Sequence, residues 1–92
     1  MIKFNSGIAT ENGKPIILKI ANIKPLANYI LRAEFPDGTV KMYDFSKLLE
    51  YEVFKPLRDE KKFKKVILDH GIPTWKEIDA DISPETIYLN GV

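Results

Sequence analysis

The sequence contains no cysteine, a single histidine and a single tryptophan among its 92 residues. Without cysteine, the chain can form neither a disulfide framework nor a metal site built from thiolates. The histidine, His70, is the only imidazole for a serine triad, and no nucleophile-elbow glycine pattern surrounds Ser6, Ser46 or Ser83. We therefore expect a protein that is not an enzyme, with no catalytic residue, no metal site and no cofactor.

An excess of charge of one sign is also missing. The chain has 14 Lys and Arg residues against 13 Asp and Glu residues, which leaves a net charge of +1. This balance argues against a dedicated nucleic-acid surface, which needs clustered positive charge. No apolar run is long enough to span a membrane, and the N-terminus lacks the apolar run of a signal peptide. We expect a cytoplasmic protein without a membrane or nucleic-acid partner.

Turn signals divide the first half of the chain into short β-elements. Asn12-Gly13 favours a type I′ hairpin between residues 7–11 and 14–20, and Pro25 is expected to end or bend the second strand. A second hairpin is predicted between residues 29–35 and 40–44. If Asp37-Gly38 is its two-residue turn, Phe35 faces Val40 and Ala33 faces Met42 on one apolar side.

The second half of the chain combines helix starts with large apolar residues. We expect Asp44 or Ser46, then Asp59, and finally Ser83 to cap short helices, because their side-chain oxygens can accept hydrogen bonds from a first helical turn. A strand over residues 66–68, a turn at Gly71 and a return strand over 72–75 are predicted between the second and third helices. The apolar anchors expected in the core are Phe45, Leu48, Leu49, Phe54, Leu57 and Phe63.

Together these elements predict an α+β fold with a small, mostly antiparallel sheet of four to five strands and short helices packed beside it. We expect residues 1–92 to form a single domain. Residues 1–15 are assigned to an N-terminal hairpin arm or extension, and residues 16–89 to the core.

The order of these motifs resembles a small bacterial family called domain of unknown function 2442. The residues that carry the resemblance are Phe35-x-Asp37-Gly38, Asp44-x-x-x-Leu48-Leu49, Val53-Phe54-x-Pro56-Leu57-Arg58-Asp59, Phe63, Trp75 and Asp81-Ile82-x-Pro84-Glu85. The resemblance covers about residues 16–89 and implies an α+β fold with an antiparallel sheet. It implies no biochemical function, but some relatives are encoded beside a second short protein, in a layout like a toxin–antitoxin pair.

Arg58, Trp75 and Asp81 are the residues that folding alone explains least well, and we take them as candidate ligand- or partner-binding residues. Arg58 can pin the turn before it through a chain carbonyl or a carboxylate, or clamp an anionic ligand. Trp75 can fill the core or form a pocket wall or interface anchor. Asp81 can organise the turn before Ser83 or, with Asp79, offer oxygen to a divalent ion.

The basic cluster consists of Lys61, Lys62, Lys64 and Lys65. It can be the solvated face of a short helix whose Phe63 points inward, or it can contact phosphates or an acidic partner. Asp59 and Glu60 partly neutralise its charge.

The leading functional hypothesis is a non-catalytic protein-interaction module. The resemblance implies one form of it, the accessory or antitoxin-like member of a small two-gene module. Its partner would be a small cognate protein or a second copy of the chain. The apolar residues Ile16, Ile17, Leu18 and Ile20 can close a sheet edge or pair with another chain. The alternative hypothesis is a small-ligand-binding module with a cleft near Arg58, Trp75 and Asp81.

Overall fold

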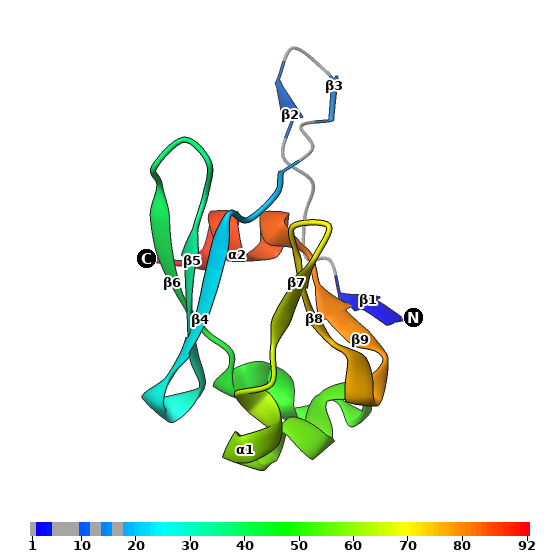
Figure 1. Ribbon diagram of the computed structural model, residues 1–92. Helices are drawn as coiled ribbons and strands as arrows, with labels where there is room; N and C mark the ends of the chain where they lie inside the picture. Colours follow the sequence, from blue (N-terminus) through cyan, green and yellow to red (C-terminus); the bar gives the residue numbers. More distant parts are fainter. Residues whose placement is uncertain (1, 5–9, 12–13, 16–17) are drawn as a thin grey trace.

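The computed structural model describes residues 2–4, 10–11, 14–15 and 18–92, with side chains from Leu18 onward. Figure 1 shows the order of the elements along the chain. The strands are β1 (Ile2–Phe4), β2 (Thr10–Glu11), β3 (Lys14–Pro15), β4 (Asn22–Leu26), β5 (Ile30–Glu34), β6 (Val40–Asp44), β7 (Ile67–Asp69), β8 (Ile72–Trp75) and β9 (Ala80–Ile82). The 3-10 helices are η1 (Ala27–Tyr29), η2 (Ser46–Glu50), η3 (Glu52–Arg58) and η4 (Lys76–Ile78), and the α-helices are α1 (Glu60–Phe63) and α2 (Pro84–Asn90).

The strands are divided between separate sheets, which lie side by side in Figure 1. β4, β5 and β6 form a three-stranded antiparallel sheet, whereas the second sheet has the order β1-β9-β8-β7, with β1 parallel to β9. The short strands β2 and β3 pair with each other as a separate two-stranded sheet. The α+β class is confirmed, but the prediction of one sheet with four to five strands is wrong.

Pro25 helps to explain why the two sheets do not merge. The prediction that it ends or bends a strand is wrong, because it lies inside the edge strand β4 and pairs with Leu31. The hydrogen bond from Phe35 N to Thr39 O shows that the backbone groups of odd-numbered residues in β5 point toward β6. Leu31, the partner of Pro25, therefore makes no backbone hydrogen bond to β4, and Pro25 occupies a non-hydrogen-bonded position of the ladder. Its missing N–H group therefore faces outward, where an edge strand tolerates proline. The missing N–H donor of Pro25 therefore interrupts the hydrogen-bonding edge of β4 that lies nearest β7.

The N-terminal hairpin has the spacing that the sequence predicts. Thr10 pairs with Pro15 and Glu11 with Lys14, which leaves two residues for the loop. The loop residues Asn12 and Gly13 lie outside the described residues, as do Ile16 and Ile17 of the predicted second arm. Residues 18–20 are not part of a strand, so the predicted strand does not extend to Ile20. Ile20 is instead buried in the core, and its N–H group donates to Gly71 O at 2.9 Å.

The β5–β6 hairpin is present, but its register differs by one residue from the prediction. Gly38 N donates to Phe35 O at 2.9 Å, Phe35 N donates to Thr39 O at 2.8 Å, and Gly38 has a φ of +90°. These bonds define a three-residue loop with a left-handed glycine, rather than the expected two-residue turn. Thr39 N also donates to Asp37 Oδ1 at 2.9 Å, and this hydrogen bond lowers the pKa of Asp37.

The shifted register places different residues of β6 on the two faces of the sheet. Ala33 pairs with Lys41, and Glu34 pairs with Val40. Ala33 is buried, whereas Val40 and Met42 are 38% and 36% exposed. The prediction that Val40 and Met42 share an apolar face with Ala33 is therefore wrong, because a shift by one residue exchanges the faces of a strand.

Two predicted helix caps, Asp59 and Ser83, are confirmed, whereas the N-cap residue of η2 is Phe45, which makes no side-chain cap hydrogen bond. Asp44, one residue earlier, accepts a hydrogen bond from Ser46 N at 2.9 Å through Oδ1, and hydrogen bonding from the Ser46 side chain, followed by that from its backbone, lowers the pKa of Asp44. The side chain of Asp59 accepts from Lys61 N at 3.0 Å at the start of α1. Ser83 Oγ accepts from Thr86 N at 3.2 Å at the start of α2, where Pro84 is the first helical residue.

One hydrophobic core joins both sheets, the helical segment between β6 and β7, and α2. All six predicted anchors are buried, and so are Leu31, Ala33, Trp75, Ile82 and Ile87. Phe45 lies at its centre, with ring-centroid distances of 5.0 Å to Phe54, 5.6 Å to Phe63 and 5.0 Å to Trp75. In Figure 1 the green helical segment that carries these phenylalanines closes one end of the space between the sheets.

The outer edge of β6 is paired with the last residue of the chain. Met42 N donates to Val92 O, and Val92 N donates to Met42 O, both at 2.9 Å. Gly91 allows this approach, because a Cβ atom at that position would lie 2.7 Å from Ile87 O and 3.0 Å from Lys41 Cβ.

Candidate functional site

Trp75, the first of the three candidate residues, belongs to the core. It is 2% exposed, and its ring stacks on Phe63 with a centroid distance of 5.9 Å. Its indole Nε1 donates a buried hydrogen bond of 2.9 Å to Phe63 O. These contacts fix the ring at the end of β8.

Asp81 lies in the middle of β9 and is 1% exposed. β9 is a strand that the sequence did not reveal, and it places Asp81 two residues before Ser83, the N-cap residue of α2. Asp81 pairs with Thr74, whereas Trp75 pairs with Ala80. Because consecutive residues of a strand point to opposite faces, Trp75 and Asp81 lie on opposite faces of the second sheet.

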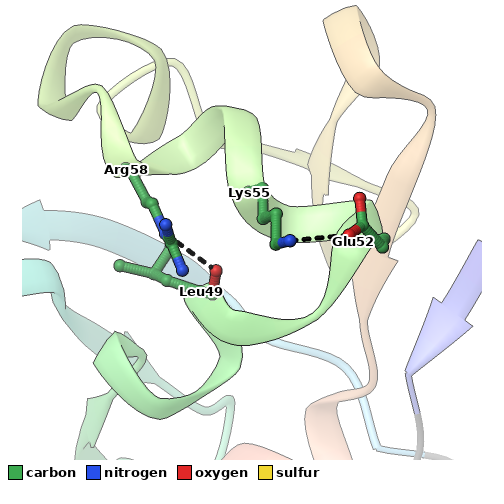
Figure 2. A network of polar contacts seen from close by, with 4 residues as sticks. All are labelled: Leu49, Glu52, Lys55 and Arg58. Carbon is green, nitrogen blue, oxygen red and sulfur yellow. Dashed lines mark hydrogen bonds and ion pairs between the residues drawn. The ribbon is translucent and has the colours of Figure 1, made fainter.

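Arg58, at the end of η3, contacts the chain rather than either of the other candidates. Figure 2 shows its Nε donating to Leu49 O at 3.1 Å. The hydroxyl group of Tyr29 donates a hydrogen bond to Arg58 O. The arginine thus connects η3 to the end of η2 through a carbonyl, one of its expected structural roles. The structure does not bring Arg58, Trp75 and Asp81 together in one cleft.

His70 occupies a tight turn, as its position before Gly71 indicates. Its φ is +54° and that of Gly71 is +80°, which suits a two-residue turn between β7 and β8. Its side chain is exposed, with Nδ1 2.6 Å from Asp69 Oδ1. Over the described part of the chain, no three His, Asp or Glu side chains gather closely enough to hold a metal ion. No helix there has the length and apolar character required to cross a bilayer.

Trp75 does contribute to a surface depression, which we call the lysine-rimmed slot. The slot has a volume of about 270 Å³ and is lined by Leu57, Lys62, Lys65, Ile67, Trp75, Lys76, Glu77 and Ile78. Leu57 and Trp75 are buried at its floor, and Ile78 is half-buried. Ile67, at the start of β7, is 42% exposed, so an apolar side chain at the slot is open to solvent.

The charges around the slot are mostly positive. Lys62, Lys65 and Lys76 are countered within the lining by Glu77 alone. Glu77 Oε2 lies 3.7 Å from Lys65 Nζ, and both side chains are more than half exposed, so this ion pair contributes at most about 1 kcal/mol to stability. The ion pair connects the loop after α1 to η4 across the slot.

Only part of this slot was visible in the sequence. The basic cluster and Trp75 were both singled out there, but as separate features. Ile67, Lys76 and Ile78 were not recognised, because the slot combines residues from η3, α1, β7, β8 and η4. No local spacing indicates this convergence. The one available signal is that an apolar residue, Ile67, follows closely on the lysine cluster.

A wider groove of about 790 Å³ lies at the end of β6 and is lined by Tyr43, Asp44, Lys47, Leu48, Glu50, Tyr51 and Asn90. Burial raises the pKa of Tyr43, and the nearby Asp44 and Tyr51 raise it further. Asp44 and Glu50 face Lys47 among the lining residues. Because charges of both signs line the groove, it favours no one class of ligand.

The comparison with protein families supports the resemblance found in the sequence. The family model described as protein of unknown function, DUF2442, matches residues 20–92. The chain belongs to the DUF2442 family. The part that matches DUF2442 contains both sheets apart from β1, all the helices, the slot and the groove, whereas β1, β2 and β3 precede it. No curated protein and no solved structure matches the chain.

Proposed function

We propose that this member of the DUF2442 family is a non-catalytic module that binds another protein through the lysine-rimmed slot. The observation that supports the proposal is an apolar concavity that is lined by a solvent-exposed residue, Ile67, and by three lysines. Interfaces between proteins are commonly organised in this way, with an apolar anchor in a pocket and a polar rim around it.

The size of the slot favours a protein side chain over a free small molecule. Its volume of about 270 Å³ is slightly below the range of about 300–1,000 Å³ that is typical for pockets that enclose a ligand. Such a space suits one or two apolar side chains presented by a partner. The partner can be a small cognate protein or a second copy of the chain, and the antitoxin-like role is one form of the first possibility.

The small-ligand hypothesis has weaker support. Of its three residues, only Trp75 lines the slot, while Arg58 is directed at Leu49 O and Asp81 is buried in β9. If a small molecule were the ligand, the site would have to be built from the slot residues instead.

The test uses a photo-crosslinking amino acid placed at one of two matched positions in cells of the native host. Ile67 lies in the slot, and Val40 is about equally exposed but lies on β6. We expect benzoylphenylalanine at position 67 to give one discrete protein adduct, identified by mass spectrometry, and position 40 to give none. Adducts of equal yield at both positions, or no adduct at 67, would refute the proposed function.

A further inference from the structure

We infer that the slot binds an acidic, amphipathic segment of the partner: one apolar side chain fills the slot, and carboxylates on both sides of it contact Lys62, Lys65 and Lys76. This inference rests on the proposed function and specifies the chemistry of the partner. Its basis is the combination of an apolar floor with a rim that carries a surplus of positive charge.

The charge surplus of the rim is local and is not a property of the whole chain. The three lysines of the slot face one carboxylate, Glu77, which leaves a surplus of two positive charges (three minus one). The whole chain carries only +1. A partner with flanking acidic residues gains attraction at this slot, whereas a basic partner is repelled.

The lysines can reach such carboxylates without distorting the fold. Lys65 and Lys76 are exposed, and Lys62 is half-buried. Lysine keeps its alkyl chain against apolar surface while its ammonium group stays in water, so the same side chains extend the apolar wall of the slot. Among the described residues, the ion pair that competes with the partner is the one between Lys65 and Glu77, which is exposed and weak.

The floor of the slot is rigid before any partner binds. Trp75 is held by its hydrogen bond to Phe63 O and by its contacts with Phe45 and Phe63. Leu57 is 1% exposed and belongs to the same core. A preformed floor avoids the entropy cost of ordering a binding surface, so a short segment can bind measurably.

The same geometry argues against nucleic acid as the occupant. Single strands bind through aromatic faces on which bases stack, beside cations that follow the phosphates. The aromatic residue of the slot, Trp75, is almost fully buried and stacks on Phe63, so its face is not available to a base. The lysines therefore surround an apolar anchor site and not a stacking platform.

The experiment titrates the folded, isotope-labelled chain with a short peptide that has one central leucine flanked by glutamates. The chain has a single tryptophan, so one indole N–H signal reports on the floor of the slot, and the methyl signals of Ile67 and Ile78 report on its walls. We expect saturable shifts of these signals and weaker binding at higher ionic strength. Serine in place of the leucine, or lysine in place of the glutamates, should abolish the shifts.

Two double variants of equal net charge distinguish the contribution of the slot lysines from a general effect of the net charge of the chain. Lys62→Glu with Lys65→Glu should weaken binding about tenfold, because two exposed charge contacts of about 0.7 kcal/mol each are lost. Lys24→Glu with Lys47→Glu changes residues outside the slot and should change affinity by less than about twofold. Circular dichroism checks that both variants are folded.

Several results would overturn the inference. One is that the acidic peptide shifts signals of residues outside the slot, and another is that the two double variants weaken peptide binding equally. A third is that octanoate or oligothymidine saturates the shifts of the slot signals while the acidic peptide has no effect. If the crosslink from position 67 persists while the acidic peptide does not bind, the inference fails but the proposed function stands. If the crosslink is also absent, the proposed function fails.

Discussion

Gly71, in the β7–β8 turn, packs closely against the segment that precedes β4, and its replacement by alanine gives the sharpest test of this packing. Its φ is +80°, a conformation that costs an L-residue about 1–2 kcal/mol. A Cβ atom there would lie 2.7 Å from Lys19 Cβ, 3.0 Å from Lys19 Cγ and 3.2 Å from Lys19 Cα. Gly71→Ala therefore forces apart the β7–β8 turn and the segment whose Ile20 donates to Gly71 O.

Gly38 is the matched control for this substitution. Its φ is +90°, but a Cβ atom at this position would meet nothing within 4 Å. Gly38→Ala should lower the free energy of unfolding by about 1–2 kcal/mol, which is the cost of the left-handed backbone conformation alone. Gly71→Ala adds the cost of overpacking, about 1–3 kcal/mol, so it should destabilise the protein by about 2–5 kcal/mol.

Urea unfolding followed by the fluorescence of Trp75 and by circular dichroism measures both variants. A third substitution, Lys19→Gly, removes the nearest side-chain atoms, Cβ and Cγ. In that background, Gly71→Ala should cost about 1 kcal/mol less than in the natural sequence, a coupling measured by a double-mutant cycle. Equal destabilisation by Gly71→Ala and Gly38→Ala, with no coupling to Lys19, would refute the argument that Lys19 packs tightly against the β7–β8 turn.

Three further predictions use pairs of variants or a change of pH. Burial raises the pKa of Tyr43 above its usual value of 10.0, so the folded state holds the phenol proton more tightly than the unfolded state does. Stability is therefore lost as pH rises through the folded pKa. The urea midpoint of the natural protein should fall between about pH 9 and 11, and that of Tyr43→Phe should fall less steeply over the same range. Ser83→Ala should cost about 1–2 kcal/mol in the same unfolding assay because it removes the cap of α2, whereas Ser46→Ala should change stability by less than about 0.5 kcal/mol; equal effects would contradict the capping assignment. Arg58→Ala should cost about 1 kcal/mol through the lost hydrogen bond to Leu49 O, and Lys55→Ala should cost almost nothing because its 2.6 Å ion pair with Glu52 is exposed; the comparison fails if Lys55→Ala has the larger effect.

The elements that the sequence predicted well depend on local interactions. Asp59 and Ser83 cap helices with their own side chains, and these short-range bonds form wherever the residues are placed before a helical turn. The turn at His70 and Gly71 is equally local, because its two residues alone determine the pairing of β7 with β8. The large apolar residues were placed in the core because a chain of this size has few alternatives for burying them.

The errors arose where the outcome depends on distant parts of the chain or on one turn residue. Pro36 ahead of Asp37 and Gly38 lengthened the turn by one residue, and that reversed the orientation of Val40 and Met42. The strand β9 was missed because Ala80–Ile82 is short and contains a central aspartate, and only pairing with β8 and β1 makes it a strand.

The candidate site was predicted in fragments. Trp75 and the basic cluster both contribute to the slot, but Arg58 and Asp81 do not line it. The sequence showed which residues were unusual, yet it could not show which face of a strand each one occupies. That assignment depends on register, and for Trp75 and Asp81 the register places them on opposite sides of one sheet.

The pairing of Val92 with Met42 has a consequence for how the folded molecule behaves at high concentration. An unpaired strand edge is a template for strands of other molecules, and Val40 and Met42 would add apolar side chains to that template. The two hydrogen bonds at 2.9 Å occupy the middle of this edge, and Gly91 permits them. A larger residue at position 91 would release the edge while the core stayed intact, so Gly91 protects the solubility of the folded protein more than its stability.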